Sequence, residues 1–247
     1  MLIDVPISNN TVPKDEIFKA DLLSLEVVEG ISFERGQVYT INACGLLNSK
    51  RNRNDGCVLV GSQSTNENGE LLNDVVIEGE ECGIGPRHFI IKYNMDNKQY
   101  YLRDLGDGNG TFVRLDTPLL LKHGYIVSFG DSHMVVQIYR EGKSSKIQLK
   151  FLDGPKTEQV FTFSDEEGEI RIGRMKSCKI QFSSHSLSRC QCVISYVNGS
   201  WILKDGDGTK LSTNGTWLFV DELYKIYNGM IFKAGQILFE AHLRRQM

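Results

Sequence analysis

A repeat with a fixed spacing limits what this chain of 247 residues can fold into. The segment Asn109-Gly-Thr-Phe-Val returns as Asn214-Gly-Thr-Trp-Leu, which begins 214 − 109 = 105 positions later. The same offset relates Gly130 to Gly235, and no gap interrupts the match between these points. A copy of about 100 residues is long enough to bury a core of its own, so the repeat indicates a duplicated domain rather than a solenoid.

The boundary between the two copies is predicted from composition. Residues 140–145, Arg-Glu-Gly-Lys-Ser-Ser, form a polar stretch between two strand-like patterns, which is typical of a linker between domains. We therefore expect an extended N-terminal tail at residues 1–19, a first domain at 20–142 and a second domain at 143–247.

Short segments alternate apolar and polar residues along most of the chain. The pattern is clear at residues 33–41, 146–151, 159–163 and 169–172, and a period of two is typical of half-buried strands. Clusters of Gly, Asn and Asp, such as residues 106–110, separate these segments and indicate turns. Because no segment has a long helical period, the sequence predicts an all-β chain that forms sandwiches or barrels.

Charge and hydropathy argue against several classes of function. The net charge of −3 offers no basic surface for nucleic acid, and the sequence has no run of about 18 apolar residues to cross a membrane. The first residues include Asp4 and Pro6 and do not resemble a signal peptide, so we expect a cytoplasmic or nuclear protein. The basic residues Lys50, Arg51 and Arg53 stand among Asn and Asp, and we expect a solvated loop there.

Motifs for metal, cofactor or catalytic chemistry do not stand out. The six cysteines have irregular spacing and no C-x-x-C pair, so we expect free, mostly buried thiols rather than a disulfide framework or a zinc site. Residues 205–210 begin like a calcium loop, but Lys210 stands where that loop requires glycine. We therefore expect no enzyme activity, no metal or cofactor, and no small-molecule substrate.

Three short motifs follow one another in the second copy. They are Gly173-Arg174 at the end of a strand-like segment, Ser188-Arg189 in the next polar stretch, and Thr213-Asn214-Gly215-Thr216. Each is ordinary alone, since Asn-Gly is a preferred hairpin turn. In this order and spacing they resemble the forkhead-associated (FHA) domain, whose pattern is Gly-Arg, then Ser-Arg-x-His, then Ser/Thr-Asn-Gly-Thr. The resemblance covers nearly all of both copies.

The resemblance implies an all-β chain of two tandem FHA-type antiparallel β-sandwiches. In this family the three motif loops lie at one end of the sandwich and bind a phosphothreonine peptide. Arg174 would then contact the phosphate, because a planar guanidinium donates two parallel hydrogen bonds to phosphate oxygens and keeps its charge. Ser188 would add a hydroxyl donor, and Arg189 would add charge beside it. Asn214 would hold the peptide main chain, with Thr213 assisting from the same loop.

One residue of the second copy departs from the family pattern. Gln191 stands where the family has a histidine that braces the binding loops. Glutamine both donates and accepts hydrogen bonds, so we expect Gln191 to take over this bracing role together with Gly173 and Gly215.

The first copy has lost most of the same motif. Ser62 takes the place of the phosphate-binding arginine and Gly85 the place of the serine, whereas His88 and Asn109 are retained. A desolvated phosphate would lack its main partners there, so we expect the first copy to keep the fold without binding phosphate. Arg87, on a neighbouring loop position, is the one candidate to substitute.

These observations lead to a predicted function and one alternative. We expect a non-catalytic adaptor that binds a threonine-phosphorylated protein through the second domain, with the first domain open to another protein partner. In the alternative, both sandwiches are phosphate-independent docking surfaces of a structural subunit in a larger assembly. Retention of Arg174, Ser188 and Asn214 together favours the adaptor, because a purely structural sandwich does not require all three.

Overall fold

The computed structural model describes residues 11–30, 36–51, 53–79 and 82–245, and they confirm the all-β prediction. The one helix in these ranges is the short 3₁₀ helix η1 (Lys14–Phe18). No helix among these residues is long and apolar enough to cross a membrane. The predicted strands at 146–151, 159–163 and 169–172 coincide with β12, β13 and β14, whereas the pattern at 33–41 yields β2 only from Val38 and lies partly outside the described residues.

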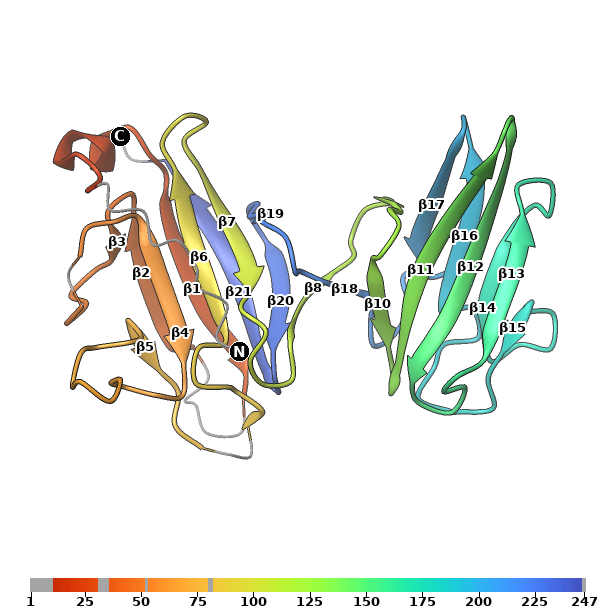
Figure 1. Ribbon diagram of the computed structural model, residues 1–247, viewed down its shortest axis with the longest axis horizontal. Helices are drawn as coiled ribbons and strands as arrows, with labels where there is room; N and C mark the ends of the chain where they lie inside the picture. Colours follow the sequence, from red (N-terminus) through yellow and green to blue (C-terminus); the bar gives the residue numbers. More distant parts are fainter. Residues whose placement is uncertain (1–10, 31–35, 52, 80–81, 246–247) are drawn as a thin grey trace. The chain divides into compact units, whose positions relative to one another are not determined.

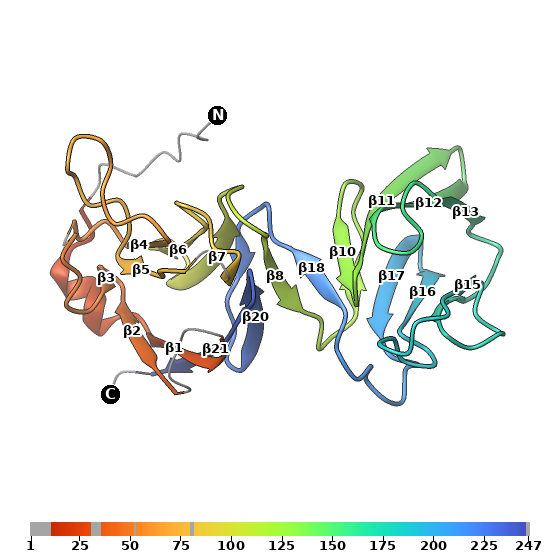
Figure 2. The ribbon, with the colours of Figure 1, turned by 90° about the horizontal axis from the view of Figure 1, so that it is seen from below.

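The chain divides into two compact units, each of which is a two-layered sandwich (Figures 1 and 2). Unit 1 combines the described residues of Met1–Val113 with those of Val220–Met247. Unit 2 is the single continuous segment Arg114–Phe219. In the order of the chain, unit 2 is therefore an insertion between two parts of unit 1.

In unit 1, one layer has the strand order β8-β20-β21-β1-β2-β3 and the other has the order β19-β7-β6-β4-β5. The bounds are β1 Leu22–Glu29, β2 Val38–Asn42, β3 Gly45–Leu46, β4 Cys57–Gly61, β5 Val75–Val76, β6 Phe89–Asn94, β7 Gln99–Asp104, β8 Thr111–Arg114, β19 Tyr224–Lys225, β20 Met230–Ala234 and β21 Ile237–Arg244. The strands are antiparallel neighbours except β4 and β5, which are parallel. Phe89, Phe232 and Phe239 meet between the layers, with ring centroids 5.0 to 5.8 Å apart.

In unit 2, the layers have the orders β13-β12-β11-β10-β18 and β15-β14-β16-β17-β9. The bounds are β9 Leu119–Leu120, β10 Ile126–Phe129, β11 Ser132–Glu141, β12 Ser144–Asp153, β13 Val160–Ser164, β14 Ile170–Gly173, β15 Ile180–Gln181, β16 Cys192–Val197, β17 Ser200–Asp205 and β18 Trp217–Phe219. Phe129, Phe151 and Phe182 pack edge to face in its core. The buried Trp201 donates a hydrogen bond from Nε1 to Ser145 Oγ at 2.9 Å.

The last three strands of each sequence copy are exchanged between the units. β9 and β19 are related by the repeat offset of 105 (224 − 119), as are β11 and β21 (237 − 132). Yet β9, β10 and β11, which come from the first copy, belong to unit 2, and β19, β20 and β21 belong to unit 1. Accordingly β21 pairs with β1, the first strand of unit 1, while β11 pairs with β12.

Because of the exchange, the bounds of the two units differ from the expected domains 20–142 and 143–247. Residues 140–145 are the tip of the β11–β12 hairpin rather than a linker, and Glu141 pairs with Ser144 across the turn Gly142-Lys143. Gly142 has a φ of 61°, which is the left-handed backbone that such two-residue turns require. Because so short a turn keeps its two strands paired with each other, β11 has to lie in the same sheet as β12.

The expected extended tail at 1–19 is also corrected where it is described. Residues 1–10 lie outside the described residues, but Val12 is 3% exposed and belongs to the core of unit 1. Its amide donates to Asn54 O at 2.7 Å, and η1 follows directly after Pro13. The physical reason is that Val12 and Ile17 are apolar and contact the core, so the backbone turns to bring both to it.

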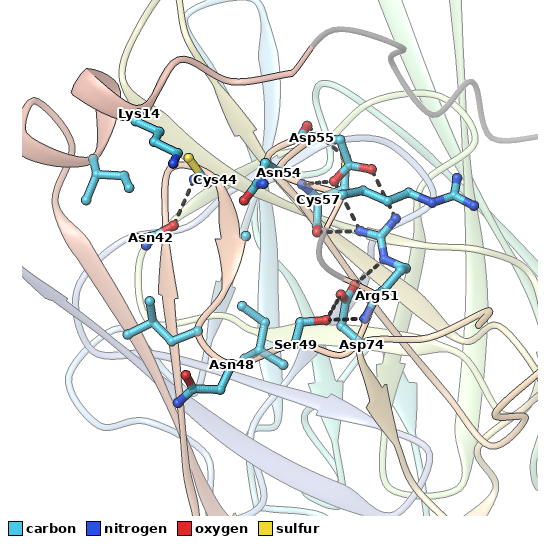
Figure 3. Close-up of a pocket in the computed structure, with 15 residues that line it drawn as sticks. Lys14, Asn42, Cys44, Asn48, Ser49, Arg51, Asn54, Asp55, Cys57 and Asp74 are labelled. Carbon is cyan, nitrogen blue, oxygen red and sulfur yellow. Dashed lines mark hydrogen bonds and ion pairs between the residues drawn. The ribbon is translucent and has the colours of Figure 1, made fainter. Parts of the chain in front are cut away.

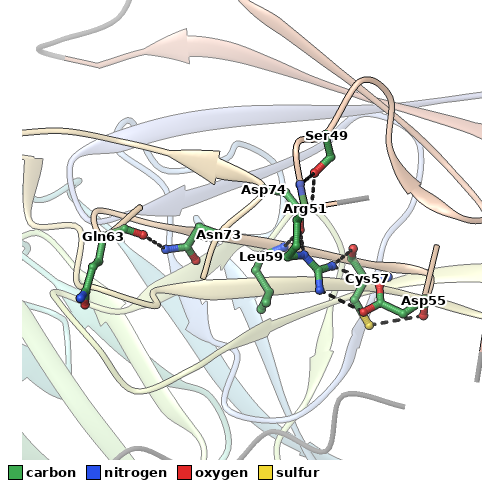
Figure 4. A network of polar contacts seen from close by, with 8 residues as sticks. All are labelled: Ser49, Arg51, Asp55, Cys57, Leu59, Gln63, Asn73 and Asp74. Carbon is green, nitrogen blue, oxygen red and sulfur yellow. Dashed lines mark hydrogen bonds and ion pairs between the residues drawn. The ribbon is translucent and has the colours of Figure 1, made fainter. Parts of the chain in front are cut away.

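Arg51 was expected in a solvated loop, but it is buried in an ion-pair network (Figures 3 and 4). Its guanidinium donates to both carboxylate oxygens of Asp55 at 3.0 and 3.1 Å and, from Nε, to Asp74 at 2.9 Å. It also donates to Cys57 O at 2.8 Å, at the start of β4. The arginine side chain is 3% exposed, and this network ties the loop at 49–55 to β4 and to Asp74. The basic residues of this segment therefore do not share one solvated loop.

All six cysteines are free thiols, as expected, and most are buried. Cys190 is partly exposed, and the other five are buried. Burial is the main cause that raises the pKa of the Cys190 and Cys57 thiols to about 11, so both stay protonated near neutral pH. Among the described residues, no group of three or more His, Cys, Asp or Glu side chains is arranged to hold a metal ion.

Candidate functional site

Three loops of unit 2 enclose a cavity that contains every residue expected to bind the phosphopeptide. The loops connect β14 with β15, β15 with β16, and β17 with β18. The residues that line the cavity are Arg174, His185, Ser186, Leu187, Ser188, Arg189, Cys190, Asp207, Lys210, Leu211, Thr213 and Asn214. All belong to Arg114–Phe219, so the candidate site lies within one unit.

The backbone around Arg174 is fixed by hydrogen bonds between two of the loops. The amide of Arg174 donates to Ser188 O at 3.2 Å, and the amide of Met175 donates to Arg189 O at 3.1 Å. Gly173 permits this contact, because a Cβ there would lie 2.5 Å from the carbonyl oxygen of Arg189. The expected role of Gly173 in holding the loops thus has a steric basis.

Ser188 and Thr213 are brought together from loops 25 residues apart. Ser188 Oγ accepts a hydrogen bond from the amide of Thr213 at 2.9 Å and lies 3.3 Å from the Thr213 hydroxyl. Asn214 Nδ2 donates to Ser186 O at 2.9 Å, so the asparagine side chain also spans the same two loops. The second and third motifs are therefore joined through both their side chains and their backbones.

The arginines of the site extend into solvent. Arg174 and Arg189 are both exposed, and none of the ion pairs formed by the described residues involves either of them. Two permanently charged guanidinium groups thus line one cavity with no carboxylate bound to them, an arrangement suited to an anion.

Gln191 is fully buried below the cavity and connects its loops. Its Oε1 accepts from the amide of Ser188 at 3.1 Å, and its Nε2 donates to Gly215 O at 3.0 Å and to Ser212 Oγ at 2.8 Å. The unit 1 counterpart, His88, has the same pair of partners. Its Nδ1 accepts from the amide of Gly85 at 3.1 Å and its Nε2 lies 3.2 Å from Gly110 O.

The glutamine therefore makes both of the hydrogen bonds that a neutral histidine makes at this place in the fold. Because the Nδ1 of His88 accepts, its proton is on Nε2, and Gln191 offers an acceptor and a donor in the same order. The departure from the family pattern thus leaves the connection between the loops in place.

A buried hydroxyl and carboxylate cluster beneath the site was not anticipated from the motifs. Asp205 Oδ1 accepts from Ser212 Oγ and from Thr216 Oγ1, both at 2.6 Å, and its Oδ2 accepts from the amide of Ser212 at 2.9 Å. The sequence signal was available, because Asp205 ends β17 as Asp104 ends β7, and a buried carboxylate requires donors. This cluster anchors the loop that presents Thr213 and Asn214.

Unit 1 keeps the loop backbone but not the binding side chains. Its amides at Ser62 and Gln63 donate to Gly85 O at 2.9 Å and to Pro86 O at 3.4 Å, which reproduces the frame around Arg174. Asn73 Nδ2 donates to Pro86 O at 2.7 Å and also to Gln63 O at 2.7 Å, and Figure 4 shows the contact with Gln63. The short Ser62 side chain stands where unit 2 has Arg174.

Arg87 does not occupy the place of the missing arginine in sequence, and part of its side chain is buried. Its counterpart in unit 2 is Cys190, since Gly85 corresponds to Ser188 (190 − 87 = 188 − 85). Its amide donates to Asp107 Oδ2 at 3.1 Å, and its Nε is buried without a hydrogen-bond partner among the described residues.

Comparison with known families agrees with the geometry. The FHA domain model matches residues 58–130 and 170–235, which together are more than half of the chain. The comparison of this chain with curated proteins found no match. FHA domains are β-sandwich modules of protein–protein interaction that recognise phosphothreonine and are not themselves catalytic. With two matched regions and two sandwiches of this kind, the chain belongs to the FHA domain family.

Proposed function

We propose that this protein is a non-catalytic adaptor that binds threonine-phosphorylated proteins through unit 2. The observation that carries the proposal is one cavity lined by Arg174, Ser188, Arg189, Thr213 and Asn214, with both guanidinium groups outside any ion pair of the described residues.

The chemistry of the cavity matches a phosphorylated side chain. A phosphothreonine carries a charge of about −1.5 to −2 and three acceptor oxygens near neutral pH, so it requires several convergent donors. Arg174 supplies a planar pair of donors, Arg189 a second cation, and Ser188 a hydroxyl. Recognition of phosphorylated segments by arginine-containing sites is an established mode of peptide binding.

Asn214 and Thr213 are assigned to the peptide rather than to the phosphate. Both are exposed at the rim of the cavity on the third loop. An amide side chain offers a donor and an acceptor, which is what an extended peptide backbone presents in return. Contacts of this kind fix the position of the peptide without reading its sequence.

For unit 1 we propose a protein-docking role that does not depend on phosphate. Its loops have the same backbone frame, but Ser62 and Gly85 replace the arginine and serine of the motif. If unit 2 also failed to bind phosphate, both units would be docking surfaces of a structural subunit, which is the alternative to the adaptor.

Titration of the full chain with a phosphothreonine peptide library tests the proposal. Removing one charge-assisted bidentate contact costs about 1.5–3 kcal/mol, so Arg174→Ala should weaken binding at least tenfold. Arg171→Ala is the matched control, because Arg171 is an exposed arginine of β14 that pairs with Glu169 and lies outside the cavity. Wild-type protein that binds phosphorylated and unphosphorylated peptides equally would refute the adaptor and support the structural alternative.

A further inference from the structure

The loop between β17 and β18 is longer in the second copy, which keeps Arg174, Ser188 and Asn214, than the matching loop is in the first copy. From Asp205 to Asn214 the chain advances 9 positions, whereas from Asp104 to Asn109 it advances 5, so unit 2 has 4 additional residues. The insertion brings Lys210 and Leu211 into the lining of the cavity.

Hydrogen bonds within the inserted segment close it into a turn. Asp207 Oδ1 accepts hydrogen bonds from the amides of Thr209 and Lys210, both at 2.9 Å, and from the Thr209 hydroxyl at 2.7 Å. The amide of Asp207 in turn donates to Lys210 O at 3.2 Å. Gly206 is required for this closure, because a Cβ there would lie 1.9 Å from the same Lys210 oxygen. Both the amide and the carbonyl of Lys210 are therefore hydrogen-bonded within this turn.

The charges around the cavity leave Lys210 without a counter-ion. Three cationic side chains line it, namely Arg174, Arg189 and Lys210, and the described residues place none of them in an ion pair. The one carboxylate in the lining, Asp207, accepts the donors of its own turn through Oδ1 and forms no ion pair among the described residues. Hydrogen bonds from Thr209 are the main cause that lowers its pKa to about 2, so it stays charged, and the three cations of the lining still outnumber it. A phosphate engages the two arginines, so Lys210 remains for a second anionic group.

We propose that Lys210 is a specificity-determining residue, which selects phosphothreonine peptides that carry an anionic side chain close to the phosphothreonine. The shared chemistry is a negative charge, which a carboxylate or a second phosphate supplies. Leu211, 53% exposed at the same wall, offers an apolar surface to the aliphatic part of the neighbouring peptide side chain. This inference rests on the proposed function, since it assigns the second element that the same cavity recognises.

The test uses the full chain and a set of singly phosphorylated threonine peptides. Each position on either side of the phosphothreonine is occupied in turn by Asp, Ala, Lys or phosphoserine. At one or more of these positions, wild-type protein should prefer Asp to Ala by about two- to fivefold, as expected for an exposed ion pair, and the preference should decrease with added salt. A larger preference for phosphoserine would identify a second phosphate as the better source of charge.

Variants of Lys210 separate this contact from general electrostatics. Lys210→Ala should abolish the preference for Asp while retaining phosphate-dependent binding, and Lys210→Glu should reverse it in favour of Lys. Lys204→Ala is the matched control, because Lys204 is an exposed lysine of β17 in the same unit that does not line this cavity. It should leave the preference unchanged.

Two results would overturn the inference, and they differ from each other. If wild-type protein binds phosphothreonine peptides and Lys210→Ala retains the preference for Asp, or wild type has none, the role of Lys210 is refuted while the proposed function stands. If wild-type protein shows no phosphate-dependent binding and Arg174→Ala behaves as wild type, the proposed function and this inference are refuted together.

Discussion

The exchange of strands makes a sharp prediction about which fragment of the chain folds. The fragment 143–247 is the second copy in sequence order, but it lacks β10 and β11 of unit 2. The fragment 114–219 contains all the strands of unit 2. We expect 114–219 to fold and bind phosphothreonine peptides, and 143–247 to be much less stable.

The magnitude follows from the side chains that the exchanged strands bury. β10 and β11 contribute Val127, Phe129, Met134 and Val136 to unit 2, all with no exposed surface. In 143–247, the only strands that can replace them are β20 and β21. The offset of 105 places Phe232, Ala234, Phe239 and Ala241 at the four corresponding positions, in that order.

The substitutes have the wrong sizes. Alanine at the position of Phe129 would leave a cavity against Phe151 and Phe182, and a loss from phenylalanine to alanine costs about 3–5 kcal/mol. Phenylalanine at the positions of Val127 and Met134 would overpack the core, at about 1–3 kcal/mol each. The total exceeds about 5 kcal/mol, which is comparable to the whole stability of a domain of this size.

Urea unfolding followed by near-ultraviolet circular dichroism measures the difference, since Trp201 lies in the core of unit 2. The expected result is a cooperative transition for 114–219 and none, or one at much lower urea, for 143–247. Equal unfolding midpoints would show that β20 and β21 fill the unit 2 core as well as β10 and β11 do, and the reasoning would be refuted.

Three further predictions concern the buried polar groups. Arg51→Ala leaves Asp55 and Asp74 as uncompensated buried charges and should destabilise unit 1 by about 3–5 kcal/mol in urea unfolding; unchanged stability would contradict this. Gln191→Ala should reduce phosphopeptide affinity at least several-fold in calorimetric titration, whereas Gln191→His should retain it, and equal loss in both would show that the bracing bonds are not what matters. The urea midpoint of wild-type unit 1 should be lower at pH 5.5 than at pH 7.5, and His88→Gln should reduce this difference; an unchanged difference would contradict the assignment to His88.

The sign of the pH effect follows from the environment of His88. Burial is the main cause that lowers its pKa below the ordinary value, and its Nδ1 accepts a hydrogen bond and cannot hold a proton. The unfolded chain takes up a proton on this histidine as pH falls below about 6.5, whereas the folded chain does not, so stability is lost in that range. Asp104, whose pKa is raised mainly by burial, acts in the opposite direction, because the folded chain takes up a proton there at higher pH than the unfolded chain does.

The period-two pattern was sufficient to predict the strands at 146–151, 159–163 and 169–172, and the motifs were sufficient to predict which loops form the candidate site. A period of two indicates burial of one face of a strand, and this is a local property of the sequence. The motif residues are close in space because the fold places their loops at one end of the sandwich. Gln191 was also interpretable, because its hydrogen-bonding capacity matches that of histidine whatever the rest of the fold does.

The sequence pattern did not reveal which segments far apart in the chain pair with each other. A Gly-containing polar stretch such as 140–145 has the composition of a linker and of a hairpin tip alike, and only the extended pairing of β11 with β12 distinguishes them. Similarly, Arg51 is a surface residue by its type, and its burial depends on Asp74, which is 23 residues away. Both errors came from judging a residue or segment by local composition when its long-range partners decide its state.

Because of the exchange, the regions that match the FHA domain model do not coincide with the two folded units. The matched region 58–130 begins in β4 of unit 1 and ends directly after β10 of unit 2. The region 170–235 begins with β14 of unit 2 and ends directly after β20 of unit 1. Each match therefore follows a sequence copy and not a sandwich.

The exchange does not divide the loops of the candidate site, because all three come from the second copy. What the exchange changes is the core beneath them, where Phe129 from the first copy packs against Phe151 and Phe182 from the second. Mutations of the first copy at β10 or β11 should consequently weaken phosphopeptide binding by unit 2, an effect that a simple tandem arrangement would not produce.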